Sequence, residues 1–140
     1  MEALALERTL TELDHARLSS LLRNDPRRGG ALPHRAVIEA VLDGCAIVPS
    51  RQVPPDVVTM YSRVELHDRD SGHRHTLTLC YPGDAAPAAG LVSVLSPVGA
   101  SLLGLTPGDV AHWSTPGGDE RQAEIVALQF QPEADGDYLK

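Results

Sequence analysis

The first candidates for chemistry in this chain are three histidines, His67, His73 and His75. The residues around them alternate between apolar and polar on both sides of a turn, which predicts two paired strands. His73 and His75 would share one strand face and His67 would lie across the hairpin, so the three imidazoles could converge on a transition metal. Only Asp68 and Asp70, in the turn, could add an oxygen ligand. The alternative is a solvent-facing histidine cluster, which we favour, and we therefore predict no metal and no cofactor.

Sequence signatures of enzymes are otherwise missing. The chain has no GxSxG nucleophile elbow, no P-loop, no HExxH pair and no dinucleotide-binding glycine motif. Serine and cysteine nucleophiles occur, but no spacing connects one of them to a histidine and an orienting acid. Cys45 and Cys80 are isolated thiols with apolar neighbours, which we expect to stay reduced. The sequence therefore predicts a protein that is not an enzyme.

Composition and charge narrow the classes of partner. The chain has 140 residues, 42% of them hydrophobic and 22% charged, as expected of about one folded domain. Nineteen acidic against twelve basic residues give a net charge of −7, which argues against direct nucleic-acid binding and against an anionic membrane as a partner. The sequence contains no apolar run of about 18 residues and no basic leader, so we expect a cytoplasmic protein.

In the first 48 residues, the spacing of apolar residues is typical of helices. Apolar residues recur at helical spacing between positions 13 and 22, and Thr11 followed by Asp14 resembles a capping box that starts a helix near residue 12. Proline and paired glycines between positions 24 and 30 end that helix. A second helix is predicted from Pro33 to about Gly44, so that residues 1–48 form a short antiparallel helical hairpin.

After this hairpin, the spacing of apolar residues changes to the alternation that is typical of strands. The proline-rich stretch 46–56 is predicted to be a stiff linker that contains the domain boundary. Strands are predicted at 60–67, 73–81, 91–95, 110–114 and 123–131, with one short helix that Ser96 caps and Gly104 ends. The acidic tail from residue 132 is expected to be loose. The predicted fold class is α+β, with the hairpin (1–48) followed by a mostly antiparallel sheet domain (49–140).

Several segments resemble bacterial Gre transcript-cleavage factors, in the same order along nearly the whole chain. They are LTELDHARL near the start, DVVTMYSRV (56–64), SPVGASLLGL (96–105), GD (108–109), HW (112–113), PGG (116–118) and QPEADGDYL (131–139). The resemblance implies a helical hairpin, an FKBP-like sheet domain and docking on RNA polymerase at the rim of its secondary channel. Smaller members of the family are associated with regulation of nucleoside diphosphate kinase, a link that we expect to act indirectly, through expression.

The resemblance also implies a cleavage mechanism that this chain departs from. In Gre factors, acidic residues at the tip of a long coiled coil help to bind Mg²⁺ and to activate water for cleavage of backtracked RNA. The hairpin predicted here has arms of about 12 residues, or about 18 Å, which is short for a probe that crosses the channel. Its tip holds a single acid, Asp25, among basic residues that include Arg27 and Arg28. Because Mg²⁺ needs clustered oxygen ligands, we predict polymerase binding without cleavage, in competition with Gre factors.

The basic tip is either a contact for polymerase or a solvated loop. The most Gre-like segment supplies the expected docking residues, which are Ser96, Pro97, Val98, Gly99 and Ser101. The alternative is architectural, because Ser96 and Pro97 suit the start of a helix, and this leaves Val98 and Ser101 as candidates for surface contact. We expect core RNA polymerase as the partner and a monomeric protein.

The FKBP-like fold also suggests a second function, that of a peptidyl-prolyl isomerase. Fold alone does not carry function, and this activity needs a pocket lined with aromatic rings. The chain has one tryptophan, three tyrosines and one phenylalanine, which makes such a lining hard to build. Trp113, which lies in a predicted strand, is expected to pack in the core.

Overall fold

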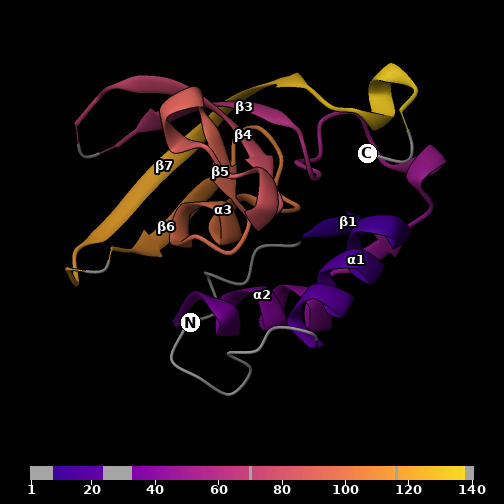
Figure 1. The fold of residues 1–140 in the computed structure, drawn as a ribbon. Coiled ribbons are helices and arrows are strands. Elements are labelled where there is room, and N and C mark those ends of the chain that lie inside the picture. Colours follow the sequence, from indigo (N-terminus) through magenta and orange to yellow (C-terminus); the bar gives the residue numbers. More distant parts are fainter. Residues whose placement is uncertain (1–7, 24–32, 70, 116, 138–140) are drawn as a thin grey trace.

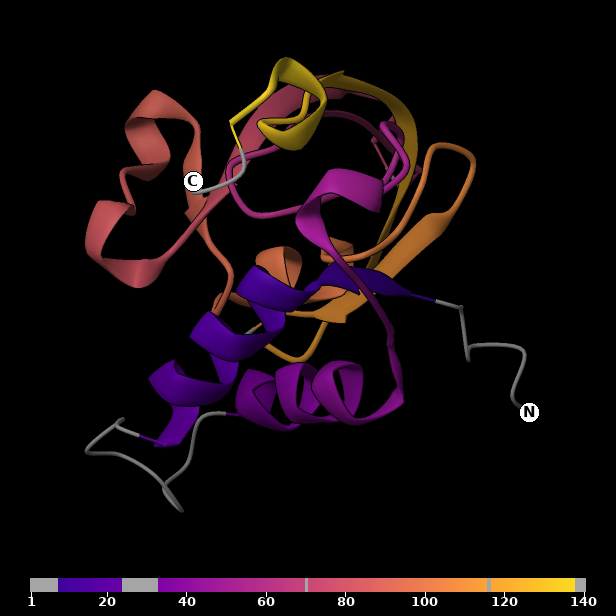
Figure 2. The same ribbon diagram turned by 90° about the vertical axis from the view of Figure 1, so that its right-hand side faces the viewer.

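The computed structural model describes residues 8–23, 33–69, 71–115 and 117–137. The amino-terminal part contains strand β1 (Thr9–Thr11), helix α1 (Glu12–Arg23), helix α2 (Pro33–Gly44) and strand β2 (Ala46–Val48). The remainder contains strands β3 (Arg63–Asp68), β4 (Arg74–Cys80) and β5 (Leu91–Ser93), helix α3 (Pro97–Leu102), and strands β6 (Val110–Ser114) and β7 (Glu120–Phe130). Figures 1 and 2 show α1 and α2 on one side of a curled sheet, with α3 between them and the sheet. The α+β fold class is confirmed.

Helices α1 and α2 begin and end close to the predicted residues. The amide of Asp14 donates to Thr11 Oγ1 at 3.0 Å, so Thr11 caps the first turn of α1 as the sequence indicates. The two helices lie side by side (Figures 1 and 2), and His15 Nε2 lies 3.0 Å from the carbonyl oxygen of Leu42. The predicted tip residues Asp25, Arg27 and Arg28 lie outside the described residues. Within the described ranges, none of the helices is long and apolar enough to span a membrane.

The prediction of a linker at 46–56 is wrong for its first three residues. These residues form β2, which pairs in parallel with β1 in the register Thr9 with Ala46 and Thr11 with Val48. The amide of Ala46 also donates to the carbonyl oxygen of Arg8 at 2.9 Å. The pairing joins segments more than thirty residues apart, and each strand is only three residues long. No local pattern in the sequence could have indicated it.

The main sheet has the strand order β5-β4-β3-β7-β6. The β3–β4, β3–β7 and β6–β7 pairs are antiparallel and the β4–β5 pair is parallel, as expected of a mostly antiparallel sheet. The register between β3 and β7 shifts twice, between Arg63 and Val64 and between Glu65 and Leu66. Such irregularities bend and twist a strand pair, which accounts for the curl visible in Figure 1.

One hydrophobic cluster joins the helices to the sheet. Leu18 of α1 and Ile38 of α2 are completely buried, together with Leu66 of β3 and with Leu103 at the end of α3. The same cluster contains further buried residues from both parts of the chain, among them Leu10, Leu22, Val41, Val58, Met60, Val64, Leu79, Leu102, Leu105 and Ile125. Short helices gain most of their stability from such packing. The division at residues 48 and 49 stays a prediction.

The tail is more firmly packed than its composition indicates. Gln131 is 3% exposed, and its Nε2 atom donates to the carbonyl oxygens of Pro54 and Val57, at 2.8 Å in each case. Glu133, in a 3₁₀ turn at Glu133–Asp135, is also buried and accepts a hydrogen bond of 2.7 Å from Thr59 Oγ1. The expectation of a loose tail from residue 132 is therefore wrong for residues 132–133, which are buried, because acidic composition does not reveal a buried carboxylate with a specific partner.

Candidate functional site

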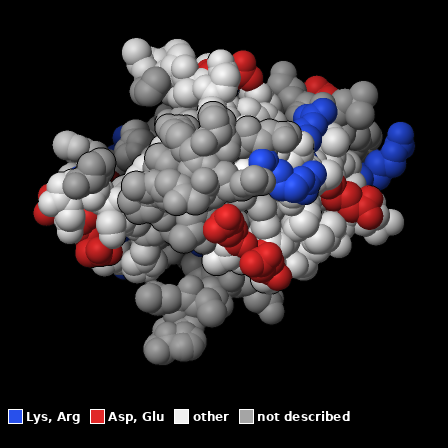
Figure 3. Space-filling model, turned by 60° about the horizontal axis from the view of Figure 1, so that its bottom comes forward, with Lys and Arg blue, Asp and Glu red and all other residues white. Residues whose placement is uncertain are grey.

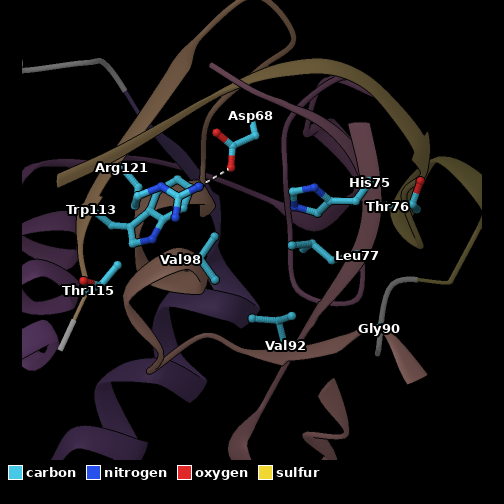
Figure 4. Close-up of a pocket in the computed structure, with 10 residues that line it drawn as sticks. All are labelled: Asp68, His75, Thr76, Leu77, Gly90, Val92, Val98, Trp113, Thr115 and Arg121. Atoms are coloured by element: carbon cyan, nitrogen blue, oxygen red, sulfur yellow. Dashed lines mark hydrogen bonds and ion pairs between the residues drawn. The ribbon is translucent and has the colours of Figure 1, made fainter. Parts of the chain in front are cut away.

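A cavity of about 400 Å³ opens on the inner side of the curled sheet, beside α3 (Figure 4). It collects residues from β3, β4, β5, α3, β6 and β7, and therefore from all five strands of the main sheet. Its lining residues are Asp68, His75, Thr76, Leu77, Gly90, Val92, Val98, Trp113, Thr115 and Arg121. A concave site with several apolar side chains and a few polar groups is the usual form of a binding site.

The apolar part of the cavity is built by Leu77 of β4, Val92 of β5 and Val98 of α3, whose side chains lie near one another in Figure 4. Leu77 is buried, and Val92 and Val98 are partly buried against the hydrophobic core. Val92 comes close to β4 because β5 pairs in parallel with it, with Val92 opposite Leu79. An apolar side chain that entered the cavity would lose contact with water on several sides, which favours binding.

The opposite wall carries an ion pair and the single tryptophan. Arg121 Nη2 lies 2.6 Å from Asp68 Oδ2, and Asp68 Oδ1 also accepts a hydrogen bond of 3.2 Å from the Ser71 amide. Trp113 of β6 faces Arg121 of β7 in the sheet register. Trp113 is partly buried against the core, as predicted, and it also forms part of the cavity wall, which the sequence did not indicate.

Helix α3 supplies Val98, and its position is fixed by its neighbours. Ser96 Oγ accepts a hydrogen bond of 3.1 Å from the Gly99 amide and so caps the helix, and Pro97 occupies the first turn. A Cβ atom on Gly99 would lie only 2.1 Å from the Ser93 carbonyl oxygen. Glycine is therefore required where α3 touches the end of β5.

The five predicted docking residues thus occupy different environments. Val98 lines the cavity, and Ser96 and Pro97 are partly exposed at the start of α3. Gly99 and Ser101 are buried, and Ser101 Oγ donates to the Val98 carbonyl oxygen at 2.7 Å. The architectural role weighed from the sequence describes Ser96 and Pro97 well, whereas Ser101, one of the two candidates for surface contact, is buried. Val98 is the residue of this set whose side chain reaches the candidate site.

The three histidines do not share a face of the β3–β4 hairpin. In the observed register, His67 lies opposite Arg74 and His75 lies opposite Leu66. His67 and His75 therefore point to opposite sides of the sheet, because residues directly opposite one another share a face. His75 reaches the cavity lining, whereas His73 is exposed next to the turn. Among the described residues, no group of three histidine, cysteine or acidic side chains is arranged to hold a metal ion.

A comparison with protein families fits this architecture. The family described as "Transcription elongation factor, GreA/GreB, C-term" matches residues 53–130, which is more than half of the chain and includes every residue of the cavity lining. The chain belongs to the GreA/GreB family. The resemblance found in the sequence segments is thereby confirmed.

Individual relatives of this GreA/GreB family protein extend the match to the amino-terminal part. A protein of Escherichia coli (strain K12) named "Regulator of nucleoside diphosphate kinase" is 40% identical over 130 residues, covering 93% of this chain and 94% of that protein. Transcription elongation factor GreA of Acidiphilium cryptum is 34% identical over 95 residues, covering 68% of this chain and 60% of that protein. The solved structure of a "Prokaryotic transcription elongation factor GreA/GreB from Nitrosomonas europaea" has a TM-score of 0.73 and 36% identity, and the match covers 89% of this chain and 100% of that one. The fold is thus similar to that of a GreA/GreB factor.

A second polar cluster, which the sequence did not reveal, fixes α1 of this family member against the loop before β3. Asp14 is 1% exposed, and its Oδ2 atom accepts a hydrogen bond of 3.1 Å from the Met60 amide. Burial raises the pKa of Asp14 to about 6, although the Met60 hydrogen bond acts in the opposite direction. The nearby carboxylate of Glu133 raises this pKa further, and the Arg17 guanidinium lowers it.

Two tyrosines lie close to this cluster. Tyr61 and Tyr81 have ring centroids 5.8 Å apart, and the Tyr61 hydroxyl donates to Asp84. Tyr61 has a φ of +68°, in the left-handed region that a bulky side chain rarely adopts. Burial and the hydrogen bond to Asp84 raise the pKa of Tyr61 to about 12, and burial also raises the pKa of Tyr81. The signal in the sequence for Asp14 is its position, because it interrupts the apolar stripe of α1.

Proposed function

We propose that this protein regulates transcription by binding core RNA polymerase at the rim of the secondary channel, in competition with Gre factors and without stimulating transcript cleavage. The family match supports the class of function, because transcription elongation is carried out by RNA polymerase. The observation that carries the proposal is the cavity beside α3. Its wall includes Val98, which belongs to the segment that most resembles Gre factors.

The chemistry of the cavity suits a protein segment with an apolar side chain. Leu77, Val92 and Val98 offer apolar surface, while Asp68 and Arg121 are already paired with each other and leave the wall close to neutral. The chain as a whole carries a net charge of −7, which suits a basic or neutral docking surface and would mainly accelerate encounter with it. On the helical face, Figure 3 shows acidic and basic side chains next to one another.

The absence of cleavage is proposed from the length of the helices. Helices α1 and α2 have 12 residues each, so each is about 18 Å long at 1.5 Å per residue. We propose that they form a short antiparallel hairpin, residues 1–48, on an FKBP-like domain, residues 49–140. The sequence of the tip, with Asp25 between Arg23 and the pair Arg27 and Arg28, lacks the clustered carboxylates that a magnesium site requires.

Three further features belong to the same proposal. The protein acts as a cytoplasmic monomer, without a cofactor and without specific contact to nucleic acid. The relative named "Regulator of nucleoside diphosphate kinase" suggests an effect on that kinase, and we propose that it arises indirectly, through transcription. An isomerase receives no support from the cavity, because Trp113 is the single aromatic residue among those that line it.

A competition titration tests the proposal. A labelled Gre factor is bound to core RNA polymerase, and this protein is added until displacement saturates. Val98→Ala removes two methylene-sized groups from the cavity wall and should weaken displacement by up to about 15-fold, at roughly 0.8 kcal/mol for each group that the partner buries. Ile47→Ala is the matched control. It also removes apolar atoms, but Ile47 is 49% exposed on β2 and does not line the cavity.

The outcomes separate the parts of the proposal. No displacement by the wild-type protein at tens of micromolar would refute polymerase binding at this site. Equal displacement by Val98→Ala and wild type would refute the cavity as the contact surface while leaving the partner in place. Addition of the protein and Mg²⁺ to backtracked complexes should produce no shortened RNA. Shortened RNA would refute the proposed absence of transcript cleavage.

A further inference from the structure

Arg8 lies outside the residues 53–130 that match the family, and it makes a set of contacts at the carboxyl end of α3. Its Nη1 atom lies 3.2 Å from the Ala100 carbonyl oxygen, 3.3 Å from that of Ser101 and 3.1 Å from that of Leu103. Carbonyl oxygens in the last turn of a helix receive no hydrogen bond from an amide of the same helix, and they carry partial negative charge. A guanidinium group satisfies several of them at once, and Arg8 therefore caps α3 from another part of the chain.

The environment of Arg8 makes this contact specific. Arg8 is partly buried, and burial lowers the pKa of its guanidinium, while the carboxylate of Asp109 acts in the opposite direction. A cation withdrawn from water must recover its hydrogen bonds from the protein. The guanidinium obtains them from the carbonyl oxygens of α3, so its position and that of the helix end depend on each other.

The backbone next to Arg8 reinforces the contact. The Thr9 amide donates to the Gly104 carbonyl oxygen at 3.2 Å. Gly104 has a φ of +84°, and a Cβ atom at this position would lie 2.9 Å from the Cβ of Arg8. The Arg8 carbonyl oxygen in turn accepts from the Ala46 amide, at the start of β2. Arg8 thus stands where β1, β2 and the end of α3 meet.

We infer that Arg8 is a positioning residue for the candidate docking site, because it holds the helix that presents Val98 to the cavity. Val98 and Ala100 belong to the same six-residue helix, so a shift of its carboxyl end moves the side chain at its amino end. The amino-terminal segment is then part of the docking apparatus, although it does not line the cavity. This inference rests on the proposed function, whose docking surface it deepens.

The test compares Arg8→Met, which keeps an unbranched apolar side chain and removes the donors, with Arg8→Lys, which keeps the charge. Affinity for core RNA polymerase is measured by competition, and stability by thermal unfolding of the free protein. Arg8→Met should bind about tenfold more weakly than wild type, and Arg8→Lys should recover a large part of this loss. Leu22→Ala, a buried substitution in α1, is the control: it should lower the melting temperature without a comparable loss of affinity.

Two further readouts distinguish positioning from general destabilisation. In the free protein, amide hydrogen exchange at residues 99–103 should be faster in Arg8→Met than in Leu22→Ala at equal melting temperature. In a double-mutant cycle, Arg8→Met should cost less affinity in the Val98→Ala background than in the wild-type background. If Arg8→Met fails to fold, Arg8→Lys replaces it in the double-mutant cycle, and a smaller loss of affinity is expected.

The outcomes keep the two proposals apart. Wild-type protein that does not bind polymerase would overturn the proposed function, and the docking role of Arg8 with it. Wild-type binding together with unchanged exchange in α3 and equal affinity of Arg8→Met would overturn the positioning role alone. An affinity loss in Leu22→Ala equal to that in Arg8→Met would also overturn it, because it would show that stability and not α3 controls binding.

Discussion

The buried carboxylate of Asp14 predicts an unusual dependence of stability on pH. Asp14 is 1% exposed and its pKa is raised from the ordinary value of 3.8 to about 6, mainly by burial. Between these two values the folded protein keeps a proton that the unfolded chain releases. The free energy of unfolding therefore falls as the pH rises from about 4 to about 6, and stays lowered above that range. The difference in pKa corresponds to about 3 kcal/mol.

The substitution Asp14→Asn isolates this effect. An asparagine has nearly the shape of the protonated acid, and its carbonyl oxygen can still accept from the Met60 amide. At pH 7 we expect the variant to be more stable than wild type by up to about 3 kcal/mol, since it carries no buried charge to desolvate. At pH 4 the two proteins should differ little, because wild-type Asp14 is then protonated when folded. Arg17, Glu133 and Tyr81, which surround Asp14, are unchanged in both proteins.

Urea unfolding from pH 4 to pH 8 measures the difference, with fluorescence of Trp113, the single tryptophan, as the probe. Asp43→Asn provides a control for removal of an exposed carboxylate, and it should change stability by no more than about 0.5 kcal/mol. An Asp14→Asn variant less stable than wild type at pH 7 would show that the charged hydrogen bond to Met60 outweighs desolvation. A stability difference that does not change with pH would equally refute the argument.

Two other substitutions test the backbone around the site. Gly99→Ala should destabilise the protein by about 2 to 3 kcal/mol in urea unfolding, because the new Cβ would lie 2.1 Å from the Ser93 carbonyl oxygen; a neutral result would show that α3 can move away from β5. Tyr61→Gly should be more stable than Tyr61→Ala by about 1 kcal/mol, because glycine adopts the φ of +68° without strain, and equal stability of the two variants would contradict the strain at this residue.

Elements with local signals could be predicted from the sequence. The Thr11 cap placed the start of α1, and the Ser96-Pro97 pair placed the start of α3. Strand β6 occupies the predicted residues 110–114, between two turns rich in proline and glycine. In each case the residues that determine the structure lie within a few positions of it, so that the pattern is complete in one short window.

Features that depend on distant partners could not be predicted. The β1–β2 pair needs two three-residue segments to meet, and neither is a convincing strand alone. Alternation correctly placed His75 in a strand, but β4 begins at Arg74 and leaves His73 outside it, and the cross-strand register decides that His67 faces the other side of the sheet from His75. The sequence indicated Asp14 as part of a capping box and Glu133 as part of a loose acidic tail, whereas in the fold their carboxylates are buried and accept hydrogen bonds from the Met60 amide and the Thr59 hydroxyl. The cavity shares this property, because its walls come from six elements.

The position of α3 connects these observations to function. This helix has six residues, too few for stability on its own, and its contacts on two sides determine where Val98 lies. Gly99 touches the end of β5 on one side, and Arg8 holds the final carbonyl groups on the other. Arg8 belongs to the segment that leads into α1, and Asp14 fixes α1 to the loop before β3. Helices α1 and α2 have only 12 residues each, and on the function proposed above the described contacts of the amino-terminal segment make it a support for α3, the helix that carries Val98.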